Sequence, residues 1–136
     1  MSPKAIQTWL QSEGYRARLE EDDEVAASIE GNSDGLPFRI VFCRPDPFDG
    51  DLDAFIDFSF FLTAEADENS TIEKINEENR KSKFVHASLG DDEGEDVVHF
   101  ALSIPVSSND LTESIFSQCF YSWTRWLPDM VEATVG

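Results

Sequence analysis

The segment from Thr71 to Pro105 constrains the fold more than any other part of the chain. It opens with a polar stretch that contains two isoleucines, and it continues into two runs of alternating apolar residues around the acidic turn Gly90–Glu95. Alternation with a period of two is typical of half-buried strands, and a short polar connection joins antiparallel neighbours. The segment therefore predicts a short helix followed by a β-hairpin.

The pairing of the hairpin strands follows from their two faces. We predict the centre of the turn between Asp92 and Glu93. The pairs are then Val85 with Phe100, Ala87 with Val98, and His86 with His99. The first two pairs place apolar residues on one face of the hairpin, and the histidine pair lies on the other face. A hairpin with one buried face requires this separation.

The polar stretch before the hairpin is expected to form a helix with a narrow buried stripe. Ser70 is the predicted N-cap, and Glu73 three residues later completes a capping box. We expect structural roles for Asn76 and Asn79. Asn79 falls in line with the two isoleucines at the junction of helix and sheet, where a buried amide needs partners. Ligand binding by Asn76 and Asn79 is the alternative.

The rest of the chain predicts further helices and strands. A first helix near 3–13 starts at Ser2-Pro3 and stops at Gly14. Strands are expected near 15–20, 25–29, 36–43 and 54–63, and a broad amphipathic helix follows Asn109-Asp110 and is bent or ended by Pro128. The order α-β-β-β-β-α-β-β-α favours an α+β fold, an antiparallel sheet with helices packed on it. The length of 136 residues suits a single domain over residues 1–136.

The chain resembles the YbjN family, described as "putative bacterial sensory transduction regulator", over nearly its whole length. The resemblance rests on Gly14-Tyr15, the helix with Asn76 and Asn79, the acidic turn Gly90–Glu95, and Trp126-Leu127-Pro128. That family is related in fold to the type III secretion chaperones, which are small, acidic and usually dimeric. The resemblance implies a chaperone-like fold, a homodimer, and binding of a protein partner instead of catalysis.

The net charge of −18 narrows the class of partner. Such a field repels phosphate backbones and anionic lipid surfaces, so we expect neither nucleic acid nor a membrane as partner. High solubility is the simplest reading of the charge, and the alternative is that it keeps a basic or aggregation-prone partner in solution. The N-terminal residues contain no long apolar run, so a cytoplasmic location is expected.

The common signatures of catalysis and of metal binding are missing from the sequence. It contains no G-x-S-x-G elbow, no phosphate-binding glycine loop and no EF-hand spacing. His86 and His99 could form a metal or pH-sensitive pair, but no third ligand has a fixed spacing to them. Cys43 and Cys119 are expected to be buried thiols and not a disulfide. We therefore predict no catalytic residue, no metal and no cofactor.

Aromatic residues supply the candidates for a partner-binding surface. Phe55 and Phe61 fall on the otherwise polar face of the strand at 54–63, and Trp123 and Trp126 lie on the last helix. Contiguous exposed aromatic side chains mark interaction sites, whereas ordinary core packing is the alternative for each of them. The sequence thus favours a non-enzymatic protein-binding domain, chaperone-like or regulatory. A module that regulates one folded partner, or an enzyme of unknown type, are the other candidates.

Overall fold

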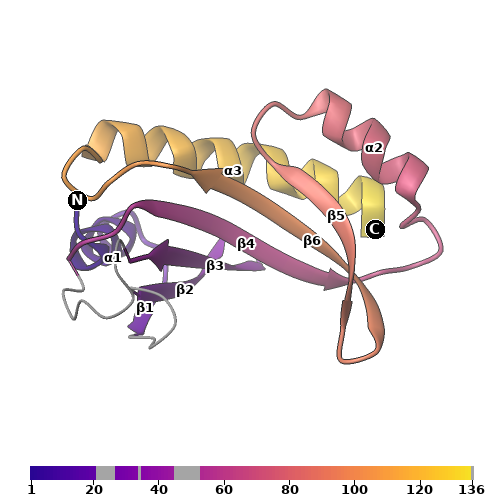
Figure 1. The fold of residues 1–136 in the computed structure, drawn as a ribbon, viewed down its shortest axis with the longest axis horizontal. Helices are drawn as coiled ribbons and strands as arrows, with labels where there is room; N and C mark the ends of the chain where they lie inside the picture. The colour runs from indigo at the N-terminus through magenta and orange to yellow at the C-terminus, as the bar shows by residue number, and fades with distance from the viewer. Residues whose placement is uncertain (21–26, 34, 45–52, 136) are drawn as a thin grey trace. The chain divides into compact units, whose positions relative to one another are not determined.

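The structure, a computed structural model, describes residues 1–20, 27–33, 35–44 and 53–135. The start of the strand predicted near 25–29 lies outside these residues. The elements in chain order are α1 (Pro3–Ser12), β1 (Ala17–Glu20), β2 (Ala27–Ser33), β3 (Leu36–Cys43), β4 (Asp57–Glu65), α2 (Ile72–Lys81), β5 (His86–Asp92), β6 (Glu95–Ile104) and α3 (Glu113–Val135) (Figure 1). The six strands form one antiparallel sheet in the order β1-β2-β3-β4-β6-β5, which confirms the predicted class and order.

The chain divides into two compact units. Unit 1 comprises Met1–Phe60 and Ser103–Ser117, and unit 2 comprises Phe61–Leu102 and Gln118–Gly136. The long elements β4, β6 and α3 each contribute residues to both units. A single domain over residues 1–136 stays a prediction.

In unit 1, the first helix begins and ends where the sequence predicts. The Ser2 hydroxyl accepts a hydrogen bond from the backbone N–H of Ala5 at 3.1 Å, and Pro3 occupies the first turn. The helix stops before Gly14, whose φ of 90° is a conformation that glycine adopts without strain. Ile6 and Leu10 are buried, and α1 packs against β1 and β2.

The strands of unit 1 bring apolar residues into line. Leu19 pairs with Ile29, which in turn pairs with Ile40, so the three lie side by side across β1, β2 and β3. Gly31 allows the close approach of β1, because a Cβ atom there would lie 2.9 Å from the carbonyl oxygen of Arg16. The core of the unit is aromatic, and its ring contacts include Phe42 with Phe55, Phe58 with Phe60, and Phe58 with Phe116.

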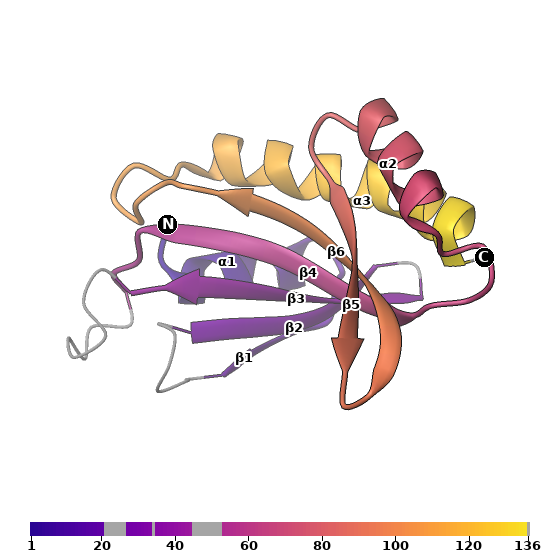
Figure 2. The same ribbon diagram turned by 45° about the vertical axis from the view of Figure 1, so that its right-hand side comes forward.

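The hairpin of unit 2 exists, but the predicted register is wrong by two residues. Asp92 pairs with Glu95, and the turn is Glu93-Gly94, with φ of 52° and 86°. Figure 2 shows the tight turn that joins β5 to β6. A two-residue hairpin turn with positive φ at both positions matches the twist of the strands, and glycine suits the second position. The turn centre therefore moves one residue along the chain. His86 pairs with Ala101 and His99 with Ser88, so the two histidines do not face each other.

The ends of α2 and α3 also differ from the prediction. Thr71, not Ser70, is the N-cap of α2, and its hydroxyl accepts a hydrogen bond from the N–H of Lys74 at 3.2 Å. The Ser70 hydroxyl instead donates to the carbonyl oxygen of Thr134 near the end of α3. For α3, the Thr112 hydroxyl accepts a hydrogen bond from the backbone N–H of Ile115. The helix therefore starts at Glu113, after the predicted start at Asn109-Asp110. The helix then continues through Pro128 to Val135.

Candidate interaction surface

The part of α3 in unit 2 carries an exposed strip of aromatic and cationic side chains. Tyr121 is 49% exposed, and Arg125 lies one helical turn further along on the same side. The guanidinium of Arg125 lies over the ring of half-buried Trp126, 6.0 Å from its centroid. The buried side of the same segment consists of Phe120, Trp123, Leu127 and Met130. We call Tyr121, Arg125 and Trp126 the α3 strip.

The composition of the α3 strip is that of a binding surface. Tyrosine, tryptophan and arginine are the residue types most enriched among those that contribute most to protein–protein binding. The distance of 6.0 Å between the Arg125 guanidinium and the ring centroid of Trp126 is within the range of a cation–π contact. The α3 strip is therefore suited to bind a protein surface.

Two of the four predicted partner-binding residues are core residues. Phe55 is 1% exposed and packs against Phe42 with ring centroids 5.1 Å apart, and Trp123 is 0% exposed. The prediction of an interaction surface was wrong for these two. The alternation that placed Phe55 on a polar face does not apply to it, because β4 begins only at Asp57. Trp123 lies on the buried stripe of α3.

Phe61 and Trp126 remain accessible. Phe61 is 37% exposed and alternates along β4 with the buried side chains of Phe60 and Leu62. On the same side of β4, the Thr63 hydroxyl and Nδ1 of His99 are 2.9 Å apart in a hydrogen bond that joins β4 to β6. Phe61 is thus an apolar side chain on a hydrogen-bonded polar surface, while Trp126 belongs to the α3 strip.

Asn79 has the structural role that its place in the buried stripe predicts. Its Nδ2–H donates to the carbonyl oxygen of Ala87 at 2.9 Å, and the N–H of Ala87 donates to its Oδ1 at 2.8 Å. The side chain therefore attaches α2 to β5. The side chain of Asn76 is exposed, so the prediction of a structural role was wrong for this residue.

The thiols and histidines do not assemble into a reactive centre. Burial, together with a hydrogen bond from the thiol to Asp57 and the charge of that carboxylate, raises the pKa of Cys43 to about 11, so the thiol stays protonated at neutral pH. Burial also raises the pKa of Cys119, and both cysteines are free thiols. Within the ranges that the structure describes, no three His, Cys, Asp or Glu side chains are grouped as a metal site would require.

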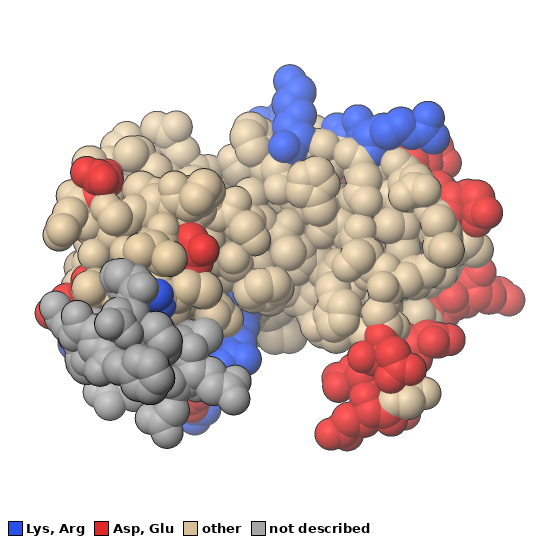
Figure 3. Space-filling view, viewed as in Figure 1, with Lys and Arg blue, Asp and Glu red and all other residues tan. Residues whose placement is uncertain are grey.

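Charge is unevenly distributed over unit 2. Figure 3 shows Lys and Arg atoms gathered over α2, and Asp and Glu atoms over the turn of the β5–β6 hairpin. Nζ of Lys81 lies 3.3 Å from Oε1 of Glu78 and 3.5 Å from Oε1 of Glu77, and these carboxylates raise the pKa of Lys81. The bases of the last helical turn, Arg80 and Lys81, also complement the helix dipole.

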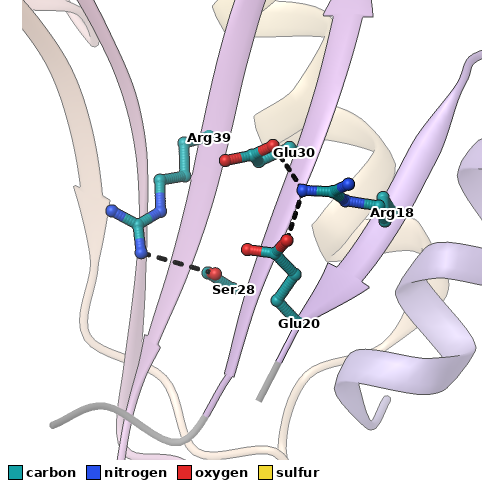
Figure 4. Close-up of polar contacts among 5 residues, drawn as sticks. All are labelled: Arg18, Glu20, Ser28, Glu30 and Arg39. Atoms are coloured by element: carbon teal, nitrogen blue, oxygen red, sulfur yellow. Dashed lines mark hydrogen bonds and ion pairs between the residues drawn. The ribbon is translucent and has the colours of Figure 1, made fainter. Parts of the chain in front are cut away.

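The outer face of β1–β3 in unit 1 carries a polar network. Arg18 forms ion pairs with Glu20 on its own strand and with Glu30 on β2, and the guanidinium of Arg39 donates to the Ser28 hydroxyl at 3.4 Å (Figure 4). The Arg18 side chain is largely exposed, and exposed ion pairs contribute little to stability. The network keeps this face of the sheet polar, and it contains no nucleophile next to a base.

Two shallow hollows lie in the described surface, one in each unit. The first has a volume of about 480 Å³ and is lined by Gly14, Tyr15, Arg16 and Asn32. The second has a volume of about 450 Å³ and is lined by Ala66, Asp67, Glu68, Ser70, Leu89, Gly90 and Asp96. The described lining of neither hollow contains a histidine or a cysteine, and the Ser70 hydroxyl in the second is hydrogen-bonded to Asp67 Oδ1 and to the carbonyl oxygen of Thr134.

The sequence did not single out Tyr121 and Arg125 as site residues. The spacing of four residues between Tyr121 and Arg125 was a usable signal, because it places these two side chains beside one another on a helix. The sequence pattern alone left open which side of the helix is buried. The burial of Phe120 and Trp123 settles this and leaves Tyr121 at the surface.

No helix in the described part of the chain is both long enough and apolar enough to span a membrane. A search of curated proteins finds no match to the sequence.

Comparison with solved structures supports the fold. The crystal structure described as "YbjN, a putative transcription regulator from E. coli" is 17% identical, with a TM-score of 0.64, and the match covers 94% of this chain and 86% of that one. The crystal structure of an uncharacterized protein from Methanothermobacter thermautotrophicus is also 17% identical, with a TM-score of 0.49 and coverage of 98% and 99%. At this level of identity, the first likeness shows a shared fold.

The family model described as "YbjN: Putative bacterial sensory transduction regulator" matches residues 2–125, which is most of the chain. The match includes the helix with Asn79, the acidic hairpin turn and Arg125. It confirms the resemblance seen in the sequence. The chain therefore belongs to the YbjN family, whose description is that of a bacterial sensory transduction regulator.

Proposed function

We propose that this protein is a non-enzymatic regulatory domain of the cytoplasm that acts by binding another protein through the α3 strip. The observation that carries the proposal is the pair of exposed side chains Tyr121 and Arg125, one turn apart on a helix whose opposite side is core, with Arg125 lying over the ring of half-buried Trp126. The family description as a regulator supports a binding role. The net charge of −18 favours protein partners over nucleic acid.

Affinity capture from the native host, followed by mass spectrometry, tests the proposal. The double variant Tyr121→Ala/Arg125→Ala removes the exposed members of the α3 strip and leaves the buried stripe intact. Phe84→Ala/Arg80→Ala is the matched control, because it also removes an exposed aromatic ring and an arginine from unit 2. We expect one protein to be captured by the wild type and the control and lost from the α3 variant. Equal capture by all three would contradict binding through the α3 strip.

The same surface could hold a partner in one of two forms. A chaperone-like role, which the resemblance to secretion chaperones favours, requires an unfolded or extended partner segment. A regulatory role requires one folded partner. Titration with the captured partner in its folded form and with peptides from its sequence separates the two, since a chaperone-like domain binds the peptides with comparable affinity.

We also propose that the protein forms a homodimer, as the resemblance to the secretion chaperones implies. Size-exclusion chromatography with light scattering, at low protein concentration, is the measurement. We expect twice the monomer mass. A monomer mass over the whole concentration range would remove this part of the proposal and leave the α3 strip untouched.

A further inference from the structure

The strands β1 and β5 are the two ends of the sheet order, so each has one row of backbone groups without a neighbouring strand. Such an edge is a template on which another chain can add a strand. Natural proteins protect these edges with charges, prolines or covering elements. In this protein, side-chain amides bond to the edge at both ends of the sheet.

At the edge of β5, Asn79 takes the place of a residue of a neighbouring strand. Its amide both donates to and accepts from the backbone of Ala87, with bonds of 2.9 and 2.8 Å. Ala87 pairs with Phe100 of β6, and because its N–H and C=O bond to Asn79, they point away from β6. Two residues earlier, the N–H of Val85 donates to the Ser82 hydroxyl at 3.1 Å. The outward-facing backbone groups at the start of this edge thus have hydrogen-bond partners in Asn79 of α2 and in Ser82, the C-cap of that helix.

The Asn79 side-chain amide bonds to the part of β5 that lacks charged residues. The segment from 85 to 90 contains no Asp, Glu, Lys or Arg, whereas Asp91 and Asp92 follow it directly. An uncharged, partly apolar edge strand is prone to pair with the same strand of another copy of the protein. The backbone N–H of Leu89, the next outward-facing one, has no hydrogen-bond partner among the described residues. The α2 amide therefore protects the uncharged half of β5, and the two aspartates protect the other half.

The backbone of β1, the other edge strand, also bonds to side-chain amides, here through one carbonyl group. Gln7 and Gln11, one turn apart on α1, both donate their side-chain N–H to the carbonyl oxygen of Ala17, at 3.1 and 3.2 Å. The charged residues Arg18 and Glu20 follow on the strand. In each terminal strand, primary amides of an adjacent helix bond to a backbone group, and charged residues follow on the strand.

We infer that these amides close the sheet to strand addition, and that loss of the Asn79 amide opens β5 to the β5 strand of a second copy. The second copy is the occupant that the edge favours, because the same uncharged segment is present on it and two such edges can pair with each other. A protein partner must then bind this protein through side-chain surfaces such as the α3 strip and not by adding a strand.

Sedimentation velocity together with infrared spectroscopy of Asn79→Ala tests the inference. Asn76→Ala is the matched control, because it removes the same side chain from an exposed position of the same helix. Ile29→Val, a core substitution in unit 1, controls for loss of stability alone. We expect Asn79→Ala to form larger species with an intermolecular strand signal, while both controls sediment like the wild type. Association equal in Asn79→Ala and Ile29→Val, or absent from Asn79→Ala, would overturn it.

Hydrogen exchange on the wild-type protein tests the same closure without any substitution. Both the Ala87 and the Leu89 N–H groups face the free edge, but only that of Ala87 has a partner in the described structure. We expect the Ala87 amide to exchange many-fold more slowly than the Leu89 amide. Equal, fast exchange at both positions would show that Asn79 does not occupy the edge and would refute the inference.

Discussion

At the scale of single residues, Asn79 shows how one side chain can substitute for a strand. Its amide makes two hydrogen bonds to the backbone of Ala87. Asn79→Ala leaves both backbone groups without their partners, so we expect the free energy of unfolding to fall by about 1–3 kcal/mol. Asn76→Ala, which removes an exposed side chain, is expected to change it by less than about 0.5 kcal/mol. Urea denaturation of both variants is the measurement, and equal stabilities would count against the structural role.

The Cys43 thiol in unit 1 is expected to make the free energy of unfolding fall at alkaline pH. Burial, helped by the hydrogen bond and the charge of Asp57, raises the pKa of this thiol to about 11. A group whose pKa is higher in the folded than in the unfolded state stabilises the fold below its unfolded pKa of about 8.5, and this contribution is lost as the pH rises through about 11. We expect Cys43→Ala to lack this part of the decline between pH 9 and 11.

Thiolate absorbance in Cys119→Ala, which leaves Cys43 as the one thiol, measures this pKa directly. We expect little thiolate at pH 9 and a titration near pH 11. Full ionisation by pH 9 in the folded protein would mean that neither burial nor Asp57 affects the thiol.

At the scale of elements, the β5–β6 hairpin depends on its turn. Gly94 has a φ of 86°, which costs an alanine about 1–2 kcal/mol, so Gly94→Ala should lower the free energy of unfolding by that amount. Glu93, with a φ of 52°, already bears such a strain, so Glu93→Gly should leave the stability unchanged or raise it. Denaturation of the two variants checks the pair. A destabilised Glu93→Gly beside a neutral Gly94→Ala would argue against this turn.

The elements also show what the sequence could and could not predict. Alternation identified β3 at its observed bounds, Leu36–Cys43, and the stripe of α2 placed Asn79 correctly. The hairpin register failed because alternation is unchanged by a shift of two residues, so only the backbone geometry at Gly94 distinguishes the alternatives. The caps of α2 and α3 failed because several neighbouring Ser, Thr, Asn and Asp residues can serve, and tertiary contacts such as that of Ser70 with Thr134 decide among them.

The candidate site was predictable only in part for the same physical reason. Trp126 and Phe61 were identified as accessible aromatic residues, and both are. Phe55 is the same residue type as Phe61, and Trp123 the same as Trp126, yet Phe55 and Trp123 are buried. The local sequence therefore does not distinguish an aromatic residue at the surface from one in the core. Which side of α3 is buried depends on contacts between elements far apart in sequence, and these became visible only in the structure.

At the scale of the whole molecule, the charge of −18 opposes compactness. Carboxylates far outnumber bases, so most of the repulsion between the carboxylates is uncompensated. Because the Debye length falls from about 30 Å at 0.01 M to about 8 Å at 0.15 M, added salt should stabilise the fold. We expect Tm to rise between these two concentrations of sodium chloride. A lower Tm at the higher concentration would mean that attractive surface pairs outweigh the net repulsion.

Binding of a protein through the α3 strip is the central functional claim for the whole molecule, and photo-crosslinking in the native host tests it most directly. A photo-reactive phenylalanine derivative in place of Tyr121 samples the α3 strip, and the same residue in place of Phe84 samples an exposed aromatic position elsewhere in unit 2. We predict a covalent adduct with one protein from position 121 and none with that protein from position 84. The absence of any adduct at position 121, or the same adducts at both positions, would contradict the claim.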